Sequence, residues 1–360
     1  MSAPLVVADA VSKRFTPRLS LGERLAVRLG SPVESRTVHA VDRVSLTIQK
    51  GEVLGLVGES GCGKSTLGRI LTGILPPSEG HVLLDGRPIM TGGRRPAKID
   101  RRIQMVFQNP FASLNPRMPI GKAISEGPIA HGLVRRDRAT TYVADWLARV
   151  GLDADYAERY PHQFSGGQRQ RIAVARALAM QPDVIVCDEP VASLDVSIQA
   201  QIINLFLELR RELALTMLFI SHDLSVVKHL CDRVAVMYLG RIVEVAQAAA
   251  LYAAPQHPYT RGLLDSIPKL RLDETPVTFY PIAGELPTPL APPSGCHFHT
   301  RCPIAEERCR VTAPPLVQVG DRREAACLLV PATDARGYAV PSCMLGGPPA
   351  ASLTPGLPLS

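Results

Sequence analysis

The chain has 360 residues, of which 46% are hydrophobic and 20% charged, and its formal net charge is +7. This composition is ordinary for a globular protein, and the length suffices for one large or two medium domains. No apolar run approaches the ~18 residues that a membrane-spanning helix requires, and the N-terminus does not resemble a signal peptide. The basic residues are scattered, which favours a solvated surface over a nucleic-acid site. The sequence predicts a cytoplasmic protein, or one bound peripherally to the cytoplasmic face of a membrane.

Two β segments are expected at residues 5–15 and 39–49, with a basic, partly apolar insert at residues 16–36 between them. The prolines and glycines of the insert suggest a loop with at most one helical turn. Phe15 ends the first segment. An aromatic ring there can stack on an adenine base. Taken alone, however, Phe15 is more simply interpreted as a buried core residue.

A glycine-rich stretch follows a short apolar run at residues 53–57 and precedes a helical pattern at residues 67–75. A strand, a glycine-rich turn and a helix in this order are typical of a phosphate-binding loop. The glycines let backbone N–H groups turn toward an anion, and the positive end of the helix points to the same place. Lys64 can reach the β- and γ-phosphates and the Ser65 hydroxyl can hold Mg²⁺. The stretch comprises Gly58, Glu59, Ser60, Gly61, Cys62, Gly63, Lys64, Ser65 and Thr66.

Further strands are expected at residues 80–85 and 102–108, and the second of them ends in Gln108. A turn-rich segment at residues 109–121 then leads to helical periodicity over residues 122–158. The next feature is a second glycine-containing turn before an alanine-rich helix at about 167–180. It is a further potential phosphate site, although serine and glycine commonly begin ordinary helices. The turn consists of Ser165, Gly166, Gly167 and Gln168.

An apolar strand at residues 183–187 ends in two carboxylates, Asp188 and Glu189. Ligands of open α/β sheets bind at the carboxyl ends of the strands. Asp188 suits Mg²⁺ ligation through water, and Glu189 suits orienting or deprotonating an attacking water. An acidic turn that merely caps a helix is the alternative interpretation.

Asp195 precedes an amphipathic helix at residues 196–212, and a strand at residues 216–220 follows. His222 comes just after this strand, where an imidazole can contact a γ-phosphate or a catalytic carboxylate. A lone histidine is more often structural, so this interpretation depends on its neighbours. A β-ribbon at residues 232–246 completes the unit. Strands that alternate with helices around a phosphate loop predict an α/β core.

Taken together, these motifs occur in the order of an ABC transporter ATP-binding subunit, and the resemblance extends over residues 4–330. The matching positions are Walker A at Gly58–Thr66, the Q-loop at Gln108, the signature at Phe164–Gln168, Walker B at Val184–Asp188, the catalytic glutamate at Glu189, the D-loop at Ser193–Asp195 and the H-loop at His222. Phe15 falls at the adenine-stacking position.

The resemblance implies an α/β P-loop NTPase fold: a RecA-like core, an antiparallel β subdomain and a helical subdomain near 109–175. It also implies that Lys64, Ser65, Gln108 and Asp188 organise Mg²⁺ and ATP. Glu189 would then act as the base and His222 would hold the γ-phosphate. In this family the signature of one ATPase contacts ATP held by the Walker A of another. The partner ATPase can be identical or different.

Within the family, the chain resembles the oligopeptide/dipeptide importer ATPases most, and more the second of the two ATPases in such systems. The motifs are at residues 108–110, 113–117, 194–202 and 257–260. The resemblance implies two integral membrane permeases, a periplasmic or extracellular peptide-binding protein, and a peripheral location on the cytoplasmic face of the inner membrane, with no nucleic acid. Residues 108–117 would meet the coupling helix of a permease. Alternatives are nickel, glutathione or antimicrobial-peptide cargo, a soluble ABC ATPase without a transport role, and a nucleotide- or metal-sensing interaction module.

A change of composition marks the C-terminal part, because more than half of the 32 prolines follow residue 254. Four of its cysteines are candidates for zinc or an iron–sulfur cluster. Their spacing lacks the short Cys-x2-Cys element of many zinc sites, so structural cysteines are an equal alternative on spacing alone. Some of the importer ATPases that the chain resembles hold a [4Fe–4S] cluster in a similar Gly-Cys-x-Phe-His-x-Arg-Cys-Pro element. The candidates are Cys296, Cys302, Cys309 and Cys327.

The predicted organisation has three parts. Residues 1–254 are expected to form the ABC ATPase domain, and residues 255–330 a small irregular region rich in cysteine and proline. Residues 331–360 are rich in proline, glycine, alanine and serine, which predicts a disordered tail.

Overall fold

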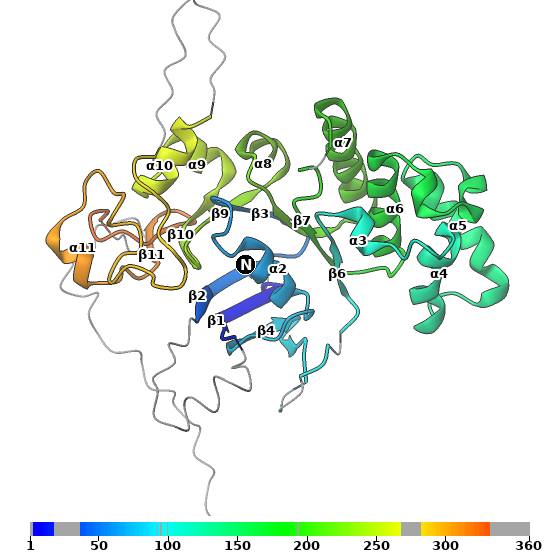
Figure 1. The fold of residues 1–360 in the computed structure, drawn as a ribbon, viewed down its shortest axis with the longest axis horizontal. Helices are drawn as coiled ribbons and strands as arrows, with labels where there is room; N and C mark the ends of the chain where they lie inside the picture. Colours follow the sequence, from blue (N-terminus) through cyan, green and yellow to red (C-terminus); the bar gives the residue numbers. More distant parts are fainter. Residues whose placement is uncertain are drawn as a thin grey trace, which may run out of the picture.

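The computed structural model describes residues 3–17, 37–91, 93, 96–98, 100–192, 194–267 and 282–331. Most of the predicted insert, Ser193 of the predicted D-loop and the predicted tail from residue 332 lie outside these residues. A large sheet forms the centre, with a helical lobe beyond one edge and the C-terminal region beyond the other (Figure 1). The predicted α/β fold class is confirmed.

The central sheet has eight strands in the order β11-β12-β10-β9-β3-β8-β7-β6. The five strands from β9 to β6 in this order run parallel to one another, whereas β10 pairs antiparallel with both β9 and β12. All residues of β3, β7 and β8 are buried, as expected for a parallel sheet covered on both faces. The parallel strands are β3 (Val53–Val57), β6 (Ile103–Val106), β7 (Val184–Asp188), β8 (Thr216–Ile220) and β9 (Arg233–Tyr238).

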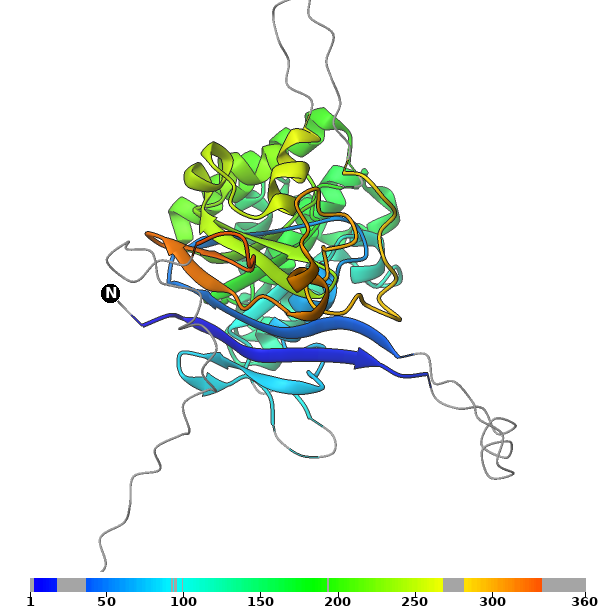
Figure 2. The same ribbon diagram turned by 90° about the vertical axis from the view of Figure 1, so that its left-hand side faces the viewer.

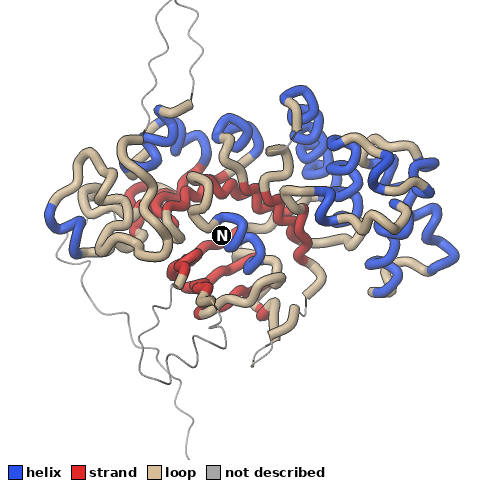
Figure 3. Tube along the Cα trace, viewed as in Figure 1, coloured by secondary structure: helices blue, strands red, loops and turns tan. Residues whose placement is uncertain are grey.

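The two faces of this sheet carry different layers. Helix α2 (Lys64–Leu71) packs on one face together with the antiparallel sheet, and α7 (Val196–Leu213) and α8 (Leu224–Leu230) pack on the other. Strand β8 contributes to both layers because its side chains alternate between the two faces of the sheet. Leu218 and Ile220 belong to the hydrophobic core that contains α2, whereas Met217 and Phe219 belong to the core that contains α7 and α8. Figure 3 shows α2 between the central sheet and the antiparallel sheet.

The antiparallel sheet has the order β2-β1-β4-β5, and its two long N-terminal strands run side by side (Figure 2). Alternate residues of β1, such as Val6 and Ala8, are buried against α2. The strands are β1 (Val6–Phe15), β2 (Val38–Ile48), β4 (Glu79–Leu84) and β5 (Arg87–Pro88). The two predicted N-terminal β segments are therefore confirmed, and the structure pairs them antiparallel with each other.

The helical periodicity predicted over residues 122–158 is confirmed, but it belongs to several short helices of the helical lobe. The chain turns at Gly132 and Gly151, whose φ angles of 69° and 70° are left-handed and end each helix. The lobe contains α3 (Pro110–Ser113), α4 (Ile120–Ala130), η1 (Arg136–Arg138), α5 (Ala139–Arg149), η2 (Ala154–Glu158), η3 (Pro161–Gln163) and α6 (Gly166–Leu178).

The C-terminal region is less irregular than predicted, because part of it extends the central sheet. Its strand β12 (Arg323–Ala325) pairs antiparallel with β10 (Arg241–Gln247), and β11 (Val317–Gly320) pairs with β12. The helices of this region are α10 (Pro258–Asp265) and α11 (Glu307–Val311), and α9 (Ala248–Ala253) directly precedes it. Among the helices of the described residues, none is both long enough and apolar enough to cross a membrane.

Candidate active site

The phosphate-binding loop begins where β3 ends at the carboxyl edge of the parallel sheet. Two glycines permit its course. A Cβ on Gly58 would lie 2.2 Å from the carbonyl oxygen of Met237, and one on Gly63 would lie 2.1 Å from that of Ala40. Both residues also have positive φ angles, of 154° and 108°. Only glycine allows this loop to pass so close to the neighbouring backbone.

The lysine and serine of the loop open helix α2. The Lys64 ammonium is buried and donates to the carbonyl oxygens of Gly58 at 2.8 Å and Glu59 at 3.0 Å. Gly63 is the N-cap and has no side chain to accept from the first turn. The loop therefore presents a cation and the positive end of a helix to the same place, which suits an anion.

Asp188 ends β7, two strands away from β3 in the sheet order. Its side chain is buried, and Oδ1 accepts a hydrogen bond of 2.8 Å from the Ser65 hydroxyl. Burial raises the pKa of this carboxyl above its ordinary value. A hydroxyl and a carboxylate in contact at a phosphate loop are ligands of the kind that Mg²⁺ prefers.

Three predicted catalytic residues meet at the ends of three adjacent strands. Glu189 Oε2 lies 3.1 Å from Gln108 Nε2, which follows β6, and 3.3 Å from His222 Nδ1, which follows β8. Glu189 itself has a φ of 46°, a left-handed conformation that costs energy in a residue other than glycine. Such strain is common at functional sites. The sheet thus brings Gln108, Glu189 and His222 together as the sequence indicated.

The signature turn, residues 165–168, lies at the start of α6 in the helical lobe and not at the phosphate-binding loop. Ser165 caps α6: its hydroxyl accepts from the Gln168 N–H at 3.3 Å, and the Gln168 side chain accepts from the Ser165 N–H at 3.0 Å. Figure 1 shows α6 in the helical lobe, away from α2. Asp195, at the N-cap of α7, is exposed as well. These residues, with Gly166 and Gly167, are not assembled around the phosphate loop of their own chain.

Phe15 lies at the end of β1 and is 42% exposed, so the alternative of a buried core residue is wrong. The Lys13 ammonium lies 5.4 Å from the centroid of its ring. An exposed ring at a strand end is accessible for stacking against a flat ligand.

The four C-terminal cysteines are neighbours but do not form a closed metal site. The Cys296 N–H donates to the Cys309 carbonyl at 2.8 Å, and burial, with a smaller effect of the other three thiols, raises the pKa of Cys296 to about 11. Burial also raises the pKa of Cys302 and Cys327. Within the described residues, which include all four, no three side chains of the metal-binding types are grouped closely enough to hold an ion.

Two residues that the sequence reasoning missed contact the phosphate loop from the C-terminal region. The Arg301 guanidinium makes two contacts to the Glu59 carboxylate, at 2.7 and 3.0 Å. The Tyr259 hydroxyl accepts from the Glu59 N–H at 2.9 Å. Both residues belong to motifs that the sequence displayed, but their partners are 242 and 200 residues away, so no local pattern could indicate the contacts.

A phosphate loop between a buried parallel strand and a helix, with a serine–aspartate contact and a glutamate in contact with a glutamine and a histidine at the same sheet edge, defines a P-loop nucleotide hydrolase. Residues 41–192 match the family model described as ABC transporter, and residues 243–309 match the one described as Oligopeptide/dipeptide transporter, C-terminal region. Relatives that match over most of the chain agree with this. The chain belongs to the ABC transporter family of ATP-binding proteins, in its oligopeptide/dipeptide group. It is an ATPase of that family.

Among the relatives is a "Putative peptide import ATP-binding protein" of Brucella abortus, 52% identical over 295 residues that cover 81% of this chain and 87% of the relative. A protein of the same description from Brucella ovis is 49% identical and covers 82% of this chain and 93% of its own length.

Solved structures show the same fold. The cbiO1 protein of Clostridium perfringens, described as part of an ABC transporter complex, has a TM-score of 0.55 and 29% identity, covering 70% of this chain and 92% of that one. An ATP-binding cassette in a dimeric post-hydrolysis state with ADP and Pi has a TM-score of 0.54 and 26% identity, covering 68% and 98%.

Proposed function

We propose that this chain hydrolyses ATP to energise a binding-protein-dependent importer of oligopeptides or dipeptides at the cytoplasmic face of the membrane. The contact of Glu189 with both Gln108 and His222 is the observation that carries the hydrolytic role. The match of residues 243–309 to the oligopeptide/dipeptide C-terminal region, and the printed names of the relatives, support the peptide cargo.

Each residue has a distinct task in this proposal. Lys64 and the first turn of α2 bind the β- and γ-phosphates. Ser65, Asp188 and Gln108 are the residues that would hold Mg²⁺. The ion neutralises charge that develops on the transferred phosphoryl group. Glu189 orients the attacking water and accepts its proton, and its contact to His222 fixes the carboxylate. His222 then faces the γ-phosphate. The exposed ring of Phe15 stacks on adenine.

The site needs a second ATPase, identical or different. Ser165, Gly166, Gly167 and Gln168 lie on α6 in the helical lobe, where they cannot reach the loop of their own chain without a rearrangement. In the proposal they contact ATP held by the partner, and Asp195 lies at the same interface. Hydrolysis removes the γ-phosphate between the two chains and releases them.

The permease contact is proposed for a hollow of about 350 Å³ between β6, α4 and α6. Phe107, Ser113 and Arg176 line it, together with the apolar Ile124 and Met180. Ser113 belongs to the 108–117 segment, so a permease segment seated here would contact the same stretch of chain that begins with Gln108. In this proposal a second permease contacts the partner ATPase in the same way.

We also propose a [4Fe–4S] cluster, with Zn²⁺ as the alternative, for Cys296, Cys302, Cys309 and Cys327. Four neighbouring thiols are a suitable donor set, although they must converge to ligate. Iron, acid-labile sulfide and zinc measured on anaerobically purified protein test this. Stoichiometric iron with sulfide supports the cluster, zinc alone supports the alternative, and neither in the wild-type protein contradicts both.

The function is tested by capture of the Glu189→Gln variant from detergent-solubilised native membranes with ATP and Mg²⁺. A variant that binds ATP without cleaving it should retain its partners, which mass spectrometry identifies. Two polytopic permeases, with or without a second ATPase and a peptide-binding protein, are expected. Permeases of a nickel or glutathione system would correct the cargo, and ribosomal or DNA-repair proteins without a permease would contradict transport.

A further inference from the structure

The phosphate-binding loop is held on its outer side by the C-terminal region. Arg301, one residue before Cys302, forms a two-pronged ion pair with the Glu59 carboxylate of the loop. The Arg301 side chain is only 5% exposed and that of Glu59 27%. Paired N–H···O contacts between a guanidinium and a carboxylate fix both distance and orientation. Arg301 Nε also donates to the Ala283 carbonyl at 3.2 Å, so all three guanidinium nitrogens have a partner.

The backbone of the same loop residue is held as well. The Glu59 N–H donates to the hydroxyl of Tyr259, which lies on α10 and is fully buried. The Tyr259 ring packs against Tyr238 with centroids 4.6 Å apart and against Phe298 at 5.4 Å. Phe298 lies between Cys296 and Cys302, so this aromatic cluster joins the four-cysteine region to the loop. Aromatic packing of this kind gives a rigid support.

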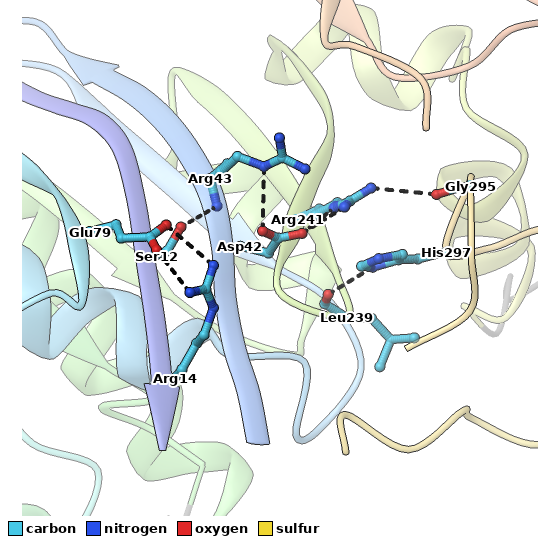
Figure 4. Close-up of polar contacts among 9 residues, drawn as sticks. All are labelled: Ser12, Arg14, Asp42, Arg43, Glu79, Leu239, Arg241, Gly295 and His297. Carbon is cyan, nitrogen blue, oxygen red and sulfur yellow. Dashed lines mark hydrogen bonds and ion pairs between the residues drawn. The ribbon is translucent and has the colours of Figure 1, made fainter. Parts of the chain in front are cut away.

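A third connection runs through the turn between β9 and β10. His297 Nδ1 lies 3.1 Å from the Leu239 carbonyl, and the next residue, Gly240, donates its N–H to the Cys62 carbonyl at 2.9 Å. Arg241 binds Asp42 and lies 3.5 Å from the Gly295 carbonyl. Figure 4 shows these side chains between β2 and the C-terminal region. The loop is thus supported at both Glu59 and Cys62.

These supports bear on the phosphate-binding lysine. The Glu59 carbonyl accepts from the Lys64 ammonium, while the same residue's N–H and carboxylate are bound by Tyr259 and Arg301. A shift of Glu59 would therefore move an acceptor of Lys64. A partly buried ion pair that loses one member also leaves an uncompensated charge beside the loop.

We infer that Arg301 is a positioning residue for the phosphate-binding loop, so that the affinity of this chain for ATP depends on the folded four-cysteine region. This inference rests on the proposed ATP site at Lys64. It adds that the C-terminal region regulates the affinity of that site for ATP. Because coupling between two sites is reciprocal, ATP binding stabilises the four-cysteine region in turn.

The test measures the dissociation constant of a fluorescent ATP analogue with Mg²⁺ on the purified full chain. Arg301→Gln and Glu59→Gln are each expected to weaken binding roughly tenfold, within the usual range of coupling between sites. The double variant should bind no more weakly than either single variant, because both remove one contact. In the assembled ATPase, Arg301→Gln should raise KM for ATP and leave kcat unchanged. Arg308→Gln is the matched control, since Arg308 pairs with Glu306 on the exposed surface of the same region.

The Lys64→Ala variant distinguishes a failure of the proposed ATP site from a failure of the positioning role of Arg301. If it weakens binding while Arg301→Gln and Glu59→Gln stay within twofold of wild type, the positioning role is wrong and the ATP site stands. If Glu59→Gln binds more tightly than wild type, Arg301 only neutralises Glu59, which also overturns the inference. If Lys64→Ala has no effect, the proposed site is wrong and the inference falls with it. Should Arg301→Gln fail to fold, Glu59→Gln tests the same contact with the C-terminal region unchanged.

Discussion

At the scale of single residues, Glu189 is the centre of the chemistry. Its carboxylate has two polar neighbours, Gln108 and His222, which follow the ends of different strands. The backbone of Glu189 has a left-handed φ of 46°, which is strained in a residue other than glycine. The amide of glutamine keeps the size of the side chain but cannot accept a proton from water. The hydrolytic step should therefore suffer far more than ATP binding.

The Glu189→Gln variant is expected to turn over ATP about 10²- to 10⁴-fold more slowly, the usual contribution of a general base. Its affinity for ATP should remain close to that of wild type. Single-turnover hydrolysis and equilibrium binding measure the two quantities. Glu208→Gln, on the exposed side of α7, is the control and should change neither. Wild-type turnover by Glu189→Gln would remove this residue from the role.

At the scale of elements, the capping box at the start of α6 is a local interaction whose contribution to stability can be measured. Ser165 and Gln168 satisfy each other's backbone N–H groups at the start of the helix. Ser165→Ala is expected to lower the free energy of unfolding by about 1 kcal/mol, as for other N-cap losses. Urea unfolding measures it, with the exposed Ser197→Ala of α7 as control. Equal stability of the two variants would show that the cap contributes nothing.

Elements with a strong local pattern could be predicted from the sequence. Strands β3, β7 and β8 are short apolar runs ended by polar or glycine residues, and their position at one sheet edge followed from parallel pairing. The lobe could not be divided correctly, because Gly132 and Gly151 end helices only through their left-handed backbone. The pairing of β12 with β10 and the Arg301–Glu59 contact join distant parts of the chain. Such contacts depend on tertiary packing that local periodicity does not encode.

At the scale of the whole molecule, two buried histidines link the C-terminal region to the sheet. Burial lowers the pKa of His257 and of His297 to about 4 each. His257 Nδ1 accepts from the Tyr259 N–H, and the Glu244 carboxylate accepts from the backbone N–H of His257. In the unfolded chain both imidazoles take up a proton near pH 6.5, so the unfolded state binds more protons between pH 4 and 6.5.

The folded protein should therefore lose stability as the pH falls from 7 to 5, by on the order of 2 kcal/mol for each histidine. The free energy of unfolding in urea at the two pH values measures this. His257→Asn keeps an acceptor at the N-cap of α10 but cannot titrate, so its loss on acidification should be smaller than that of wild type. An unchanged pH dependence in this variant would show that His257 is not the group responsible.

The claim that the chain powers peptide import is tested most directly by uptake. The measurement is the uptake of a radiolabelled oligopeptide by cells whose own copy of this chain is replaced by Glu189→Gln, with Glu208→Gln as the matched replacement. The account predicts that uptake is lost with Glu189→Gln and retained with Glu208→Gln, at equal amounts of membrane-bound protein. Uptake at the wild-type rate in the Glu189→Gln cells would contradict it.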